Sequence, residues 1–464
     1  MVALGDYFRY VYPIKYCKEE SLMTYDYDVL YIGGGHAAHD GAAPLAASGQ
    51  RVAVVERDLM GGTCTNYGCN AKITLDEAVK LTRERARVGQ IVDGPLTMNW
   101  AQSQAHKRAV IDPQPQELID KLTSHGATVI TGSARFKDAH TVTINGTRDV
   151  TAEKIVIATG LVPHRLAIPG SELAHDSRDF LDLDHLPAHL TIVGSGYISL
   201  EFATIANAAG AAVTILLHGD TVLRHFYQPY VQLVVADLKR RGVTFIANAN
   251  VQAFTRDQTG YGVDYGDHQH LTTHWILDAT GRVPHLDDLG LETVGVQFDR
   301  HGITVNDHLQ TTVPNIYAAG DVIASDQPKL TPTATFESKY LTQLFTGQTS
   351  APIDFPVIPS VVFTSPRIAQ AGVTVNEAQQ RGLSITHNDL ETYWYYRIDR
   401  EPLVKSTQIH DAQGHLVGVT EVSDQAPDVI NTLLPAIEFQ FNRDQINRLV
   451  GLFPTMGYAA WHRA

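Results

Sequence analysis

The first two thirds of the chain alternate between short apolar runs and longer segments with helical periodicity. An apolar run at residues 28–32 precedes a glycine-rich turn, an alanine-rich helical segment to residue 48 and a second apolar run at residues 51–56. Such runs are typical of strands buried on both faces, and a helix between two of them predicts a βαβ unit. The same order recurs at residues 190–217. We therefore expect an α/β protein with two Rossmann-like units.

The pattern changes near residue 350. Three runs, ETYWYYRI, LVKSTQI and LVGVTEV, are separated by turn residues and predict an antiparallel sheet. No glycine-rich turn accompanies them in the sequence. We expect a C-terminal α+β domain that serves assembly rather than nucleotide binding.

Each predicted βαβ unit carries a glycine-rich turn before its helix. In the first unit, Gly33 permits a tight turn and Gly35 lets the backbone approach a pyrophosphate. Glu56 ends the following strand, where it can accept hydrogen bonds from ribose hydroxyls. Gly194 and Gly196 repeat the turn in the second unit. Two such turns in one chain predict two dinucleotide sites.

Further candidate nucleotide contacts lie where predicted strands end. The apolar runs that begin at residues 155, 276 and 316 end in ATG, ATGR and AGD. In α/β sheets, ligands bind at the carboxyl ends of the strands. The candidates at these strand ends are Thr159, Gly160, Gly281, Arg282, Gly320 and Asp321. Further candidates are Ala38 in the first turn, and Gly62 and Thr63 directly before Cys64.

The segment GGTCTNYGCNAK places Cys64 and Cys69 directly after the first nucleotide-binding pattern. In a regular α-helix the Cα atoms of residues i and i+5 are about 8.5 Å apart, beyond the limit of about 7 Å for a disulfide. A bridge therefore requires a distorted turn, which Gly68 can supply. Because a helix N-terminus lowers the pKa of a thiol, the segment predicts a reactive, redox-active pair.

Composition narrows the class of partner. The 464 residues carry 36 Lys and Arg against 50 Asp and Glu, a formal net charge of −14. Nucleic-acid binding requires clustered basic residues, so we expect no nucleic-acid partner. Three cysteines are too few for a secreted disulfide framework and favour a cytoplasmic location. We expect no membrane span, and no site for a metal ion, because spacings such as HExxH do not occur.

Together these motifs resemble those of the flavoprotein disulfide reductases, the family that includes glutathione reductase, dihydrolipoamide dehydrogenase and mercuric reductase. The resemblance extends from Asp28 through GGTCTNYGCNAK, GSGYISLE, AAGD and KLTPTATFES. It implies an FAD domain, an inserted NAD(P)H domain and a C-terminal α+β dimerisation domain. It also implies a homodimer in which the C-terminal segment completes the partner's active site. The expected division is an extension at 1–22, FAD-domain segments at 23–162 and 284–349, an NAD(P)H domain at 163–283 and an interface domain at 350–464. We expect Met23 to be the natural start and residues 1–22 to be dispensable.

The resemblance also implies individual roles. Cys64 would exchange with the substrate, and Cys69 would contact the flavin. Lys72 and Glu201 would pair near flavin N5. Further along the chain, Asp321 would bond to the flavin ribitol, and Tyr197 would cover the nicotinamide pocket.

The residues that follow the second strand of the second unit predict the cofactor preference. Leu217 stands where an NAD-specific site keeps an acidic residue, and His218 and Arg224 follow. A carboxylate would repel a 2′-phosphate, whereas Arg224 and a protonated His218 would attract it. We expect NADPH to be preferred, with NADH possible.

The C-terminal signature departs from the family pattern. Members that reduce disulfides carry His-Pro-Thr-x-x-Glu, whose His relays a proton to the interchange thiol. Here Phe453 replaces the His and Tyr458 replaces the Glu, and His462 is the nearest substitute. The C-terminal cysteine pair of mercuric reductases is absent from the sequence. Three functions therefore stay open. They are reduction of disulfides that need little proton assistance, reduction of metal ions or of quinones and other oxidants, and redox sensing with little turnover. The acceptor would be a small molecule.

Overall fold

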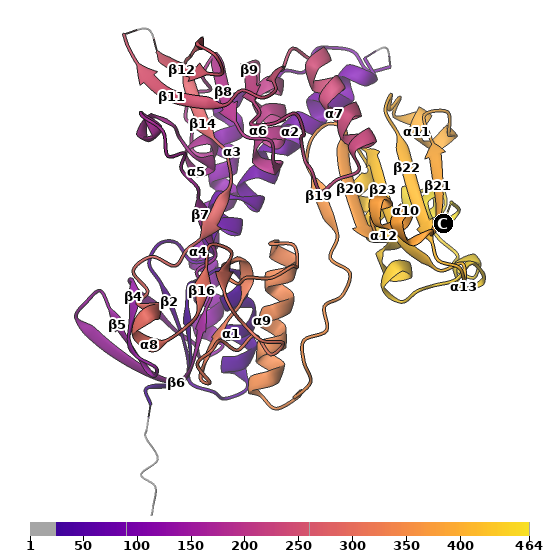
Figure 1. Ribbon diagram of the computed structural model, residues 1–464. Coiled ribbons are helices and arrows are strands. Elements are labelled where there is room, and N and C mark those ends of the chain that lie inside the picture. The colour runs from indigo at the N-terminus through magenta and orange to yellow at the C-terminus, as the bar shows by residue number, and fades with distance from the viewer. Residues whose placement is uncertain (1–24, 90, 259, 464) are drawn as a thin grey trace, which may run out of the picture.

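The computed structural model describes residues 25–89, 91–258 and 260–463, so the expected extension at 1–22 lies outside the described residues. The chain forms three bodies, with the two nucleotide-type units at one side and the C-terminal body at the other (Figure 1). A long extended segment joins the end of the first unit to the C-terminal body (Figure 1). The confirmed fold is α/β with a C-terminal α+β domain.

The first body is built on a mainly parallel sheet. Its strands are β1 (Tyr27–Ile32), β2 (Val52–Glu56), β3 (Thr128–Thr131), β4 (Ala134–Asp138), β5 (Thr141–Ile144), β6 (Arg148–Ile157) and β18 (Ile316–Ala318). The order is β3-β2-β1-β6, β18 pairs in parallel with β6, and β5 and β4 extend the early part of β6 in antiparallel fashion. The helices of this body are α1 (His36–Ala47), α4 (Gln114–Ser124), α8 (Leu291–Val294) and α9 (Thr331–Phe345).

The second body repeats the parallel arrangement. Its sheet contains β8 (His189–Val193), β9 (Ala212–Leu216), β10 (Thr244–Ile246) and β14 (Trp275–Asp278), in the order β10-β9-β8-β14. An antiparallel sheet of β11 (Val251–Arg256), β12 (Tyr261–Tyr265) and β13 (Gln269–Thr273) lies beside it. Its helices are α5 (Ser177–Leu181), α6 (Tyr197–Ala208) and α7 (Gln228–Arg240).

The chain enters and leaves the second body at one place. Strand β7 (Leu161–Pro163) leaves the first body after β6, and β15 (Arg282–Pro284) returns beside it in an antiparallel ladder. After a short hairpin, β16 (Phe298–Asp299) and β17 (Gly302–Ile303), the chain rejoins the first sheet at β18. The second body is therefore inserted into the first.

Helix α2 (Cys69–Arg87) connects the bodies through its packing. Its buried residues Leu75 and Val79 share a hydrophobic cluster with Leu200 of α6 and with Val362 and Val422 of the C-terminal body. Helix α3 (Trp100–Ile111) adds Trp100 to the same cluster. The helix that begins at a cysteine is thus held by a core outside the sheet that precedes it.

The C-terminal body is an antiparallel sheet covered by helices. The strands are β19 (Ser360–Val362), β20 (Arg367–Gly372), β21 (Ser384–Asp389), β22 (Lys405–His410) and β23 (Leu416–Ser423), in the order β19-β20-β23-β22-β21. The helices are α10 (Val375–Arg381), α11 (Trp394–Ile398), α12 (Ala426–Glu438), α13 (Arg443–Asn447) and α14 (Met456–Trp461). Across the described chain, none of the helices combines the length and the apolar character needed to cross a membrane.

Candidate active site

The two glycine-rich turns have the same geometry. Gly33 has φ 105° and Gly194 has φ 138°, and a Cβ there would lie 2.4 Å from the Ala158 carbonyl oxygen and 2.2 Å from the Ala279 carbonyl oxygen. Any side chain would collide with the neighbouring strand end. Only glycine lets the chain turn from β1 into α1, and from β8 into α6, at this distance.

The helix ends after these turns are open to a ligand. Apart from the adjoining residues of the turn, no described atom lies within 4 Å of a Cβ built at Gly35 or Gly196. In the described chain no side chain caps α1 or α6, and the first turn of each lacks an acidic residue. Uncapped N–H groups at a helix N-terminus bind anions. These two helix ends therefore fit the pyrophosphates of two dinucleotides.

Glu56 lies beside the first turn. Its carboxylate accepts hydrogen bonds from the backbone N–H of Gly34 at 2.7 Å and of Asp58 at 2.7 Å. Ala38 is fully buried in α1 against the sheet. The end of β2 and the first turn are thus locked together.

The strand-end candidates gather between β7, β15 and the segment before α2. The Arg282 guanidinium donates to the Leu161 carbonyl at 2.7 Å and lies 3.5 Å from the Thr63 hydroxyl oxygen. Thr159, next to Gly160, donates its hydroxyl to the His285 carbonyl at 2.7 Å. Burial lowers the pKa of Arg282. The structure therefore brings Thr63 and Arg282 into contact.

Asp321 begins a second polar group at the end of β18. Burial raises the pKa of Asp321, and the nearby Lys329 and Arg282 charges oppose this change. Glu337 of α9, which the sequence patterns do not single out, accepts a hydrogen bond from the Gly320 N–H at 2.5 Å. Burial raises the pKa of Glu337 to about 7. The Gly320 turn is thus tied to α9.

Cys64 lies within a distorted turn, and Cys69 begins the α-helix that follows it. Residues Thr63–Tyr67 form a π-helical turn, and the α-helix begins only at Cys69. Gly68 lies between them, where a Cβ would be 2.9 Å from the Thr63 carbonyl oxygen. The distortion that the i, i+5 spacing requires is therefore present. Both cysteines are free thiols in the structure.

Charge is concentrated on Cys69. A hydrogen bond from Cys64 lowers the pKa of Cys69 to about 6 against the opposing effect of burial, and the Lys72 charge contributes. The same hydrogen bond, together with burial, raises the pKa of Cys64. The Sγ of Cys69 lies 3.9 Å from the hydroxyl of Thr331, the first residue of α9. Two helix N-termini therefore meet at this thiol, which favours its thiolate.

A pH titration follows from this arrangement. In the reduced protein the Cys69 thiolate should be present at neutral pH and should disappear as the pH falls through about 6, because the folded pKa lies below that of a free thiol. The ultraviolet thiolate absorbance of wild type minus that of Cys69→Ser measures it. A midpoint at the ordinary pKa of cysteine would contradict the assignment.

Lys72 and Glu201 form the expected ion pair. The Lys72 ammonium lies 2.9 Å from both carboxylate oxygens of Glu201, although the residues are 129 positions apart. Both are largely buried, and the backbone N–H of Phe363 donates to Glu201 at 2.9 Å. The Lys72 ammonium also lies 4.7 Å from the centre of the Phe363 ring. Helix α2, the second body and the C-terminal body therefore contribute to this pair, and the contribution of Phe363 gives no signal in the sequence.

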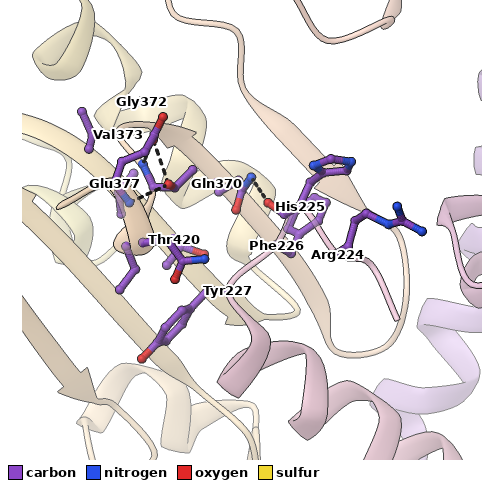
Figure 2. A pocket seen from close by; sticks show the side chains of 13 residues that line it. Arg224, His225, Phe226, Tyr227, Gln370, Gly372, Val373, Glu377 and Thr420 are labelled. Carbon is purple, nitrogen blue, oxygen red and sulfur yellow. Dashed lines mark hydrogen bonds between the residues drawn. The ribbon is translucent and has the colours of Figure 1, made fainter. Parts of the chain in front are cut away.

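The second glycine turn is covered by the loop that carries Arg224. The Leu223 N–H donates to the Ser195 carbonyl at 2.9 Å, so this loop lies directly on the turn. Arg224 and His218 are exposed. Tyr197, the first residue of α6, packs edge-on against Phe226 with ring centres 5.8 Å apart. Arg224 also lines a cavity of about 230 Å³ between this loop and the C-terminal body. The Arg224 side chain points away from Gly372 and Glu377, which line the same cavity (Figure 2).

The C-terminal residues form an exposed aromatic group. Phe453 is 66% exposed, and its ring lies 6.0 Å from that of Trp394 and 5.2 Å from that of Tyr458. His462 stacks on Tyr458 with ring centres 4.5 Å apart, and its Nε2 is 3.4 Å from the tyrosine hydroxyl. The C-terminus lies at the outer side of the C-terminal body, away from α2 of the same chain (Figure 1). Trp394 had not been singled out from the sequence.

Comparisons with known proteins agree with this geometry. Residues 27–338 match the family model described as pyridine nucleotide-disulphide oxidoreductase, and residues 358–464 match its dimerisation domain. A glutathione reductase from Nostoc sp. is 30% identical over 458 residues, which cover 93% of this chain and 98% of the relative. A mercuric reductase from Lysinibacillus sphaericus is 30% identical over 446 residues, 93% of this chain and 81% of the relative.

A solved structure is also similar. It is the Cu(II) complex of the HOCl-induced flavoprotein disulfide reductase RclA from Escherichia coli, with a TM-score of 0.85 and 25% identity over 93% of this chain and 98% of that chain. The chain belongs to the pyridine nucleotide-disulphide oxidoreductase family, whose members are FAD-dependent enzymes that use NAD(P)H.

Proposed function

We propose that this enzyme passes electrons from NAD(P)H through the Cys64–Cys69 pair to a disulfide-type acceptor. The observation that carries the proposal is the pair of free thiols joined by the distorted turn, in which Cys69 lies at the N-terminus of α2 and near Thr331 of α9. In this position the pKa of Cys69 is lowered and that of Cys64 is raised. A dithiol in which one sulfur is a stabilised thiolate and the other is protonated suits two-electron exchange with a disulfide.

The residues around the pair have separable tasks. FAD, when bound, would accept a hydride from the nicotinamide and supply two electrons to the disulfide form of the pair. The glycine turn with Glu56 would hold its pyrophosphate and ribose, and Asp321 would bond to the ribitol. Lys72, held by Glu201, would keep positive charge near Cys69. Tyr197 would cover the nicotinamide.

Cys64 would then react with the acceptor. Its thiol must lose a proton before it can attack an acceptor disulfide, and its raised pKa makes this loss unfavourable. An external base would normally take that proton. Phe453 offers none in the family position, so proton transfer would fall to His462 or to solvent.

Reduction of soft metal ions is the second candidate. Dithiols bind ions such as Cu(II) and Hg(II), and metal reduction does not require a protonated leaving thiol. The relatives include a mercuric reductase and a reductase solved with Cu(II). The aromatic group at Phe453 would be compatible with metal-ion reduction, because that reaction needs no acid or base at this position.

A panel of acceptors tests these proposals. We expect NADPH oxidation with at least one of glutathione disulfide, lipoamide, an aryl disulfide, Cu(II), Hg(II) and a quinone, and loss of that activity in Cys64→Ser. Activity with Cu(II) or Hg(II) alone would support the second candidate. Failure with all acceptors would support a redox sensor instead.

We also assign the domains and the assembly. FAD would bind to residues 23–162 and 284–349, and NAD(P)H to residues 163–283. The β7–β15 ladder, where the chain crosses between the bodies, supports these boundaries. Residues 350–464 would form a homodimer interface, supported by the family's dimerisation domain. Phe453 and Tyr458 would then face Cys64 of the other subunit.

The cofactor preference gives a further prediction. Arg224→Ala should lower kcat/KM for NADPH by about 10-fold and change that for NADH little, because Arg224 lies on the loop that covers the second glycine turn. Steady-state rates with both cofactors measure the ratio. Arg256→Ala, on β11, is a matched control that should leave the ratio unchanged. An unchanged ratio in Arg224→Ala would remove this assignment.

A further inference from the structure

A group of potential metal ligands lies in the seam between α1 and α9. His36, His39 and Asp40 follow one another on α1, and their ligand atoms all lie within 4.8 Å of one another. The helices are closely packed here, because a Cβ at Gly41 would lie 2.6 Å from the Ser338 carbonyl oxygen. The group does not include the thiol pair, and it begins at His36, the first residue of α1 after the glycines of the turn.

His39 is the unusual member. It is 3% exposed, and within the described chain neither of its ring nitrogens has a hydrogen-bond partner. Its Nδ1 lies 3.2 Å from Oδ1 of Asp40, but not in hydrogen-bond geometry. A buried imidazole whose ring nitrogens make no hydrogen bond costs free energy and calls for an explanation.

The other two residues are already oriented toward it. His36 Nδ1 is 2.9 Å from Oδ2 of Asp40, and the Thr335 hydroxyl of α9 donates to the same oxygen at 2.7 Å. The rings of His36 and His39 lie 4.6 Å apart between centres. The Thr335 bond fixes the carboxylate, as outer hydrogen bonds do for metal ligands.

We propose that His36, His39 and Asp40 bind a divalent transition-metal ion of the Cu(II) or Zn(II) type. Two imidazoles and one carboxylate suit these ions rather than Mg²⁺ or Ca²⁺, which prefer oxygen ligands. Bonds of about 2.1 Å bring ligand atoms to within about 4.2 Å of one another. Rotation of the partly exposed His36 ring can close the remaining gap. Water would complete the coordination.

The position gives the site a connection to the redox centre. Thr335, which holds Asp40, lies one helical turn after Thr331, and the Thr331 hydroxyl is 3.9 Å from the Sγ of Cys69. His36 directly follows Gly35 in the first glycine turn. A metal ion in the seam would therefore add positive charge next to the dinucleotide end of α1 and link α1 to α9.

The experiment uses FAD-loaded enzyme in which Cys64→Ser and Cys69→Ser remove both thiols. Cu(II) is added with a weak chelator, which keeps the ion off isolated surface histidines. We expect one Cu(II) per chain, with nitrogen splitting from two imidazoles in the electron paramagnetic resonance spectrum. Competition by Zn(II) should displace it.

Single variants identify the ligands. His36→Gln and His39→Gln should each weaken Cu(II) binding by about 100-fold and reduce the nitrogen splitting to that of one imidazole. His175→Gln is the matched control, because His175 has an aspartate at the same i, i+4 spacing but is not part of such a group. Since His36 is partly exposed, its variant should fold even if His39→Gln does not. Binding that is absent in the parent, or unchanged in His36→Gln, would overturn the proposal. The result is independent of the acceptor, because no turnover is measured.

Discussion

Replacing Cys64 with serine should reduce turnover by about 10³-fold or more with the acceptor that wild type reduces fastest, because it removes the sulfur proposed to exchange with that acceptor. The same loss is expected for Cys69→Ser. Stopped-flow or steady-state NADPH oxidation measures both. The flavin should stay bound in both variants, since no cysteine contributes to the glycine turn.

The two variants should nevertheless differ in their spectra. Two-electron reduction of wild type opens the disulfide and should produce a long-wavelength absorbance from the Cys69 thiolate beside the oxidised flavin. Cys64→Ser cannot form the disulfide, so it should show this absorbance before any reduction and lose it when the flavin is reduced. Cys69→Ser should lack this absorbance. Equal loss in both variants would show that the roles of the two cysteines have been assigned wrongly.

Installing a proton relay should increase disulfide reduction. Phe453→His combined with Tyr458→Glu restores the His-Pro-Thr-x-x-Glu sequence, since Pro454 and Thr455 are already present. We expect turnover with glutathione disulfide or lipoamide to rise by at least about 10-fold, because general acid–base catalysis typically contributes ~10²–10⁴-fold. The surrounding side chains were not shaped for the pair, which keeps the gain near the lower limit. Rates for wild type, both single variants and the double variant measure it.

A quinone acceptor supplies the control for this experiment. It needs no protonated leaving thiol, so the double variant should change its rate little. If Phe453 and Trp394 instead pack against a bulky acceptor, the double variant should lose activity with every acceptor. Fast reduction of glutathione disulfide by wild type would contradict the role given to Phe453.

Local patterns in the sequence were sufficient to predict the repeated units. The turns at Gly33 and Gly194 depend on neighbouring residues and on one strand end, so their spacing indicates their structure. The distorted turn between Cys64 and Cys69 also follows from spacing alone. The Lys72–Glu201 pair was predicted only by resemblance, because the two residues meet through packing of α2 on α6.

Contacts made by distant segments could not be predicted in this way. Thr331 lies near Cys69 because α9, although 262 residues later in the chain, packs beside the start of α2. Phe363 donates to Glu201 because the C-terminal body packs against the second body. The group at His36 was missed for a different reason. Its residues are neighbours in sequence, but its significance depends on the burial of His39, which a search for known ligand spacings does not detect.

The packing of α2 has a consequence for cooperativity. Leu75 and Val79 of this helix are buried together with Leu200 of the second body and with Val422 of the C-terminal body. The helix that starts at Cys69 therefore cannot separate from either body without exposing apolar surface of both. Heating should melt these parts in one step rather than body by body. The lowered pKa of Cys69 would therefore persist for as long as the chain stays folded. On heating, the Cys69 thiolate and nucleotide binding would be lost together.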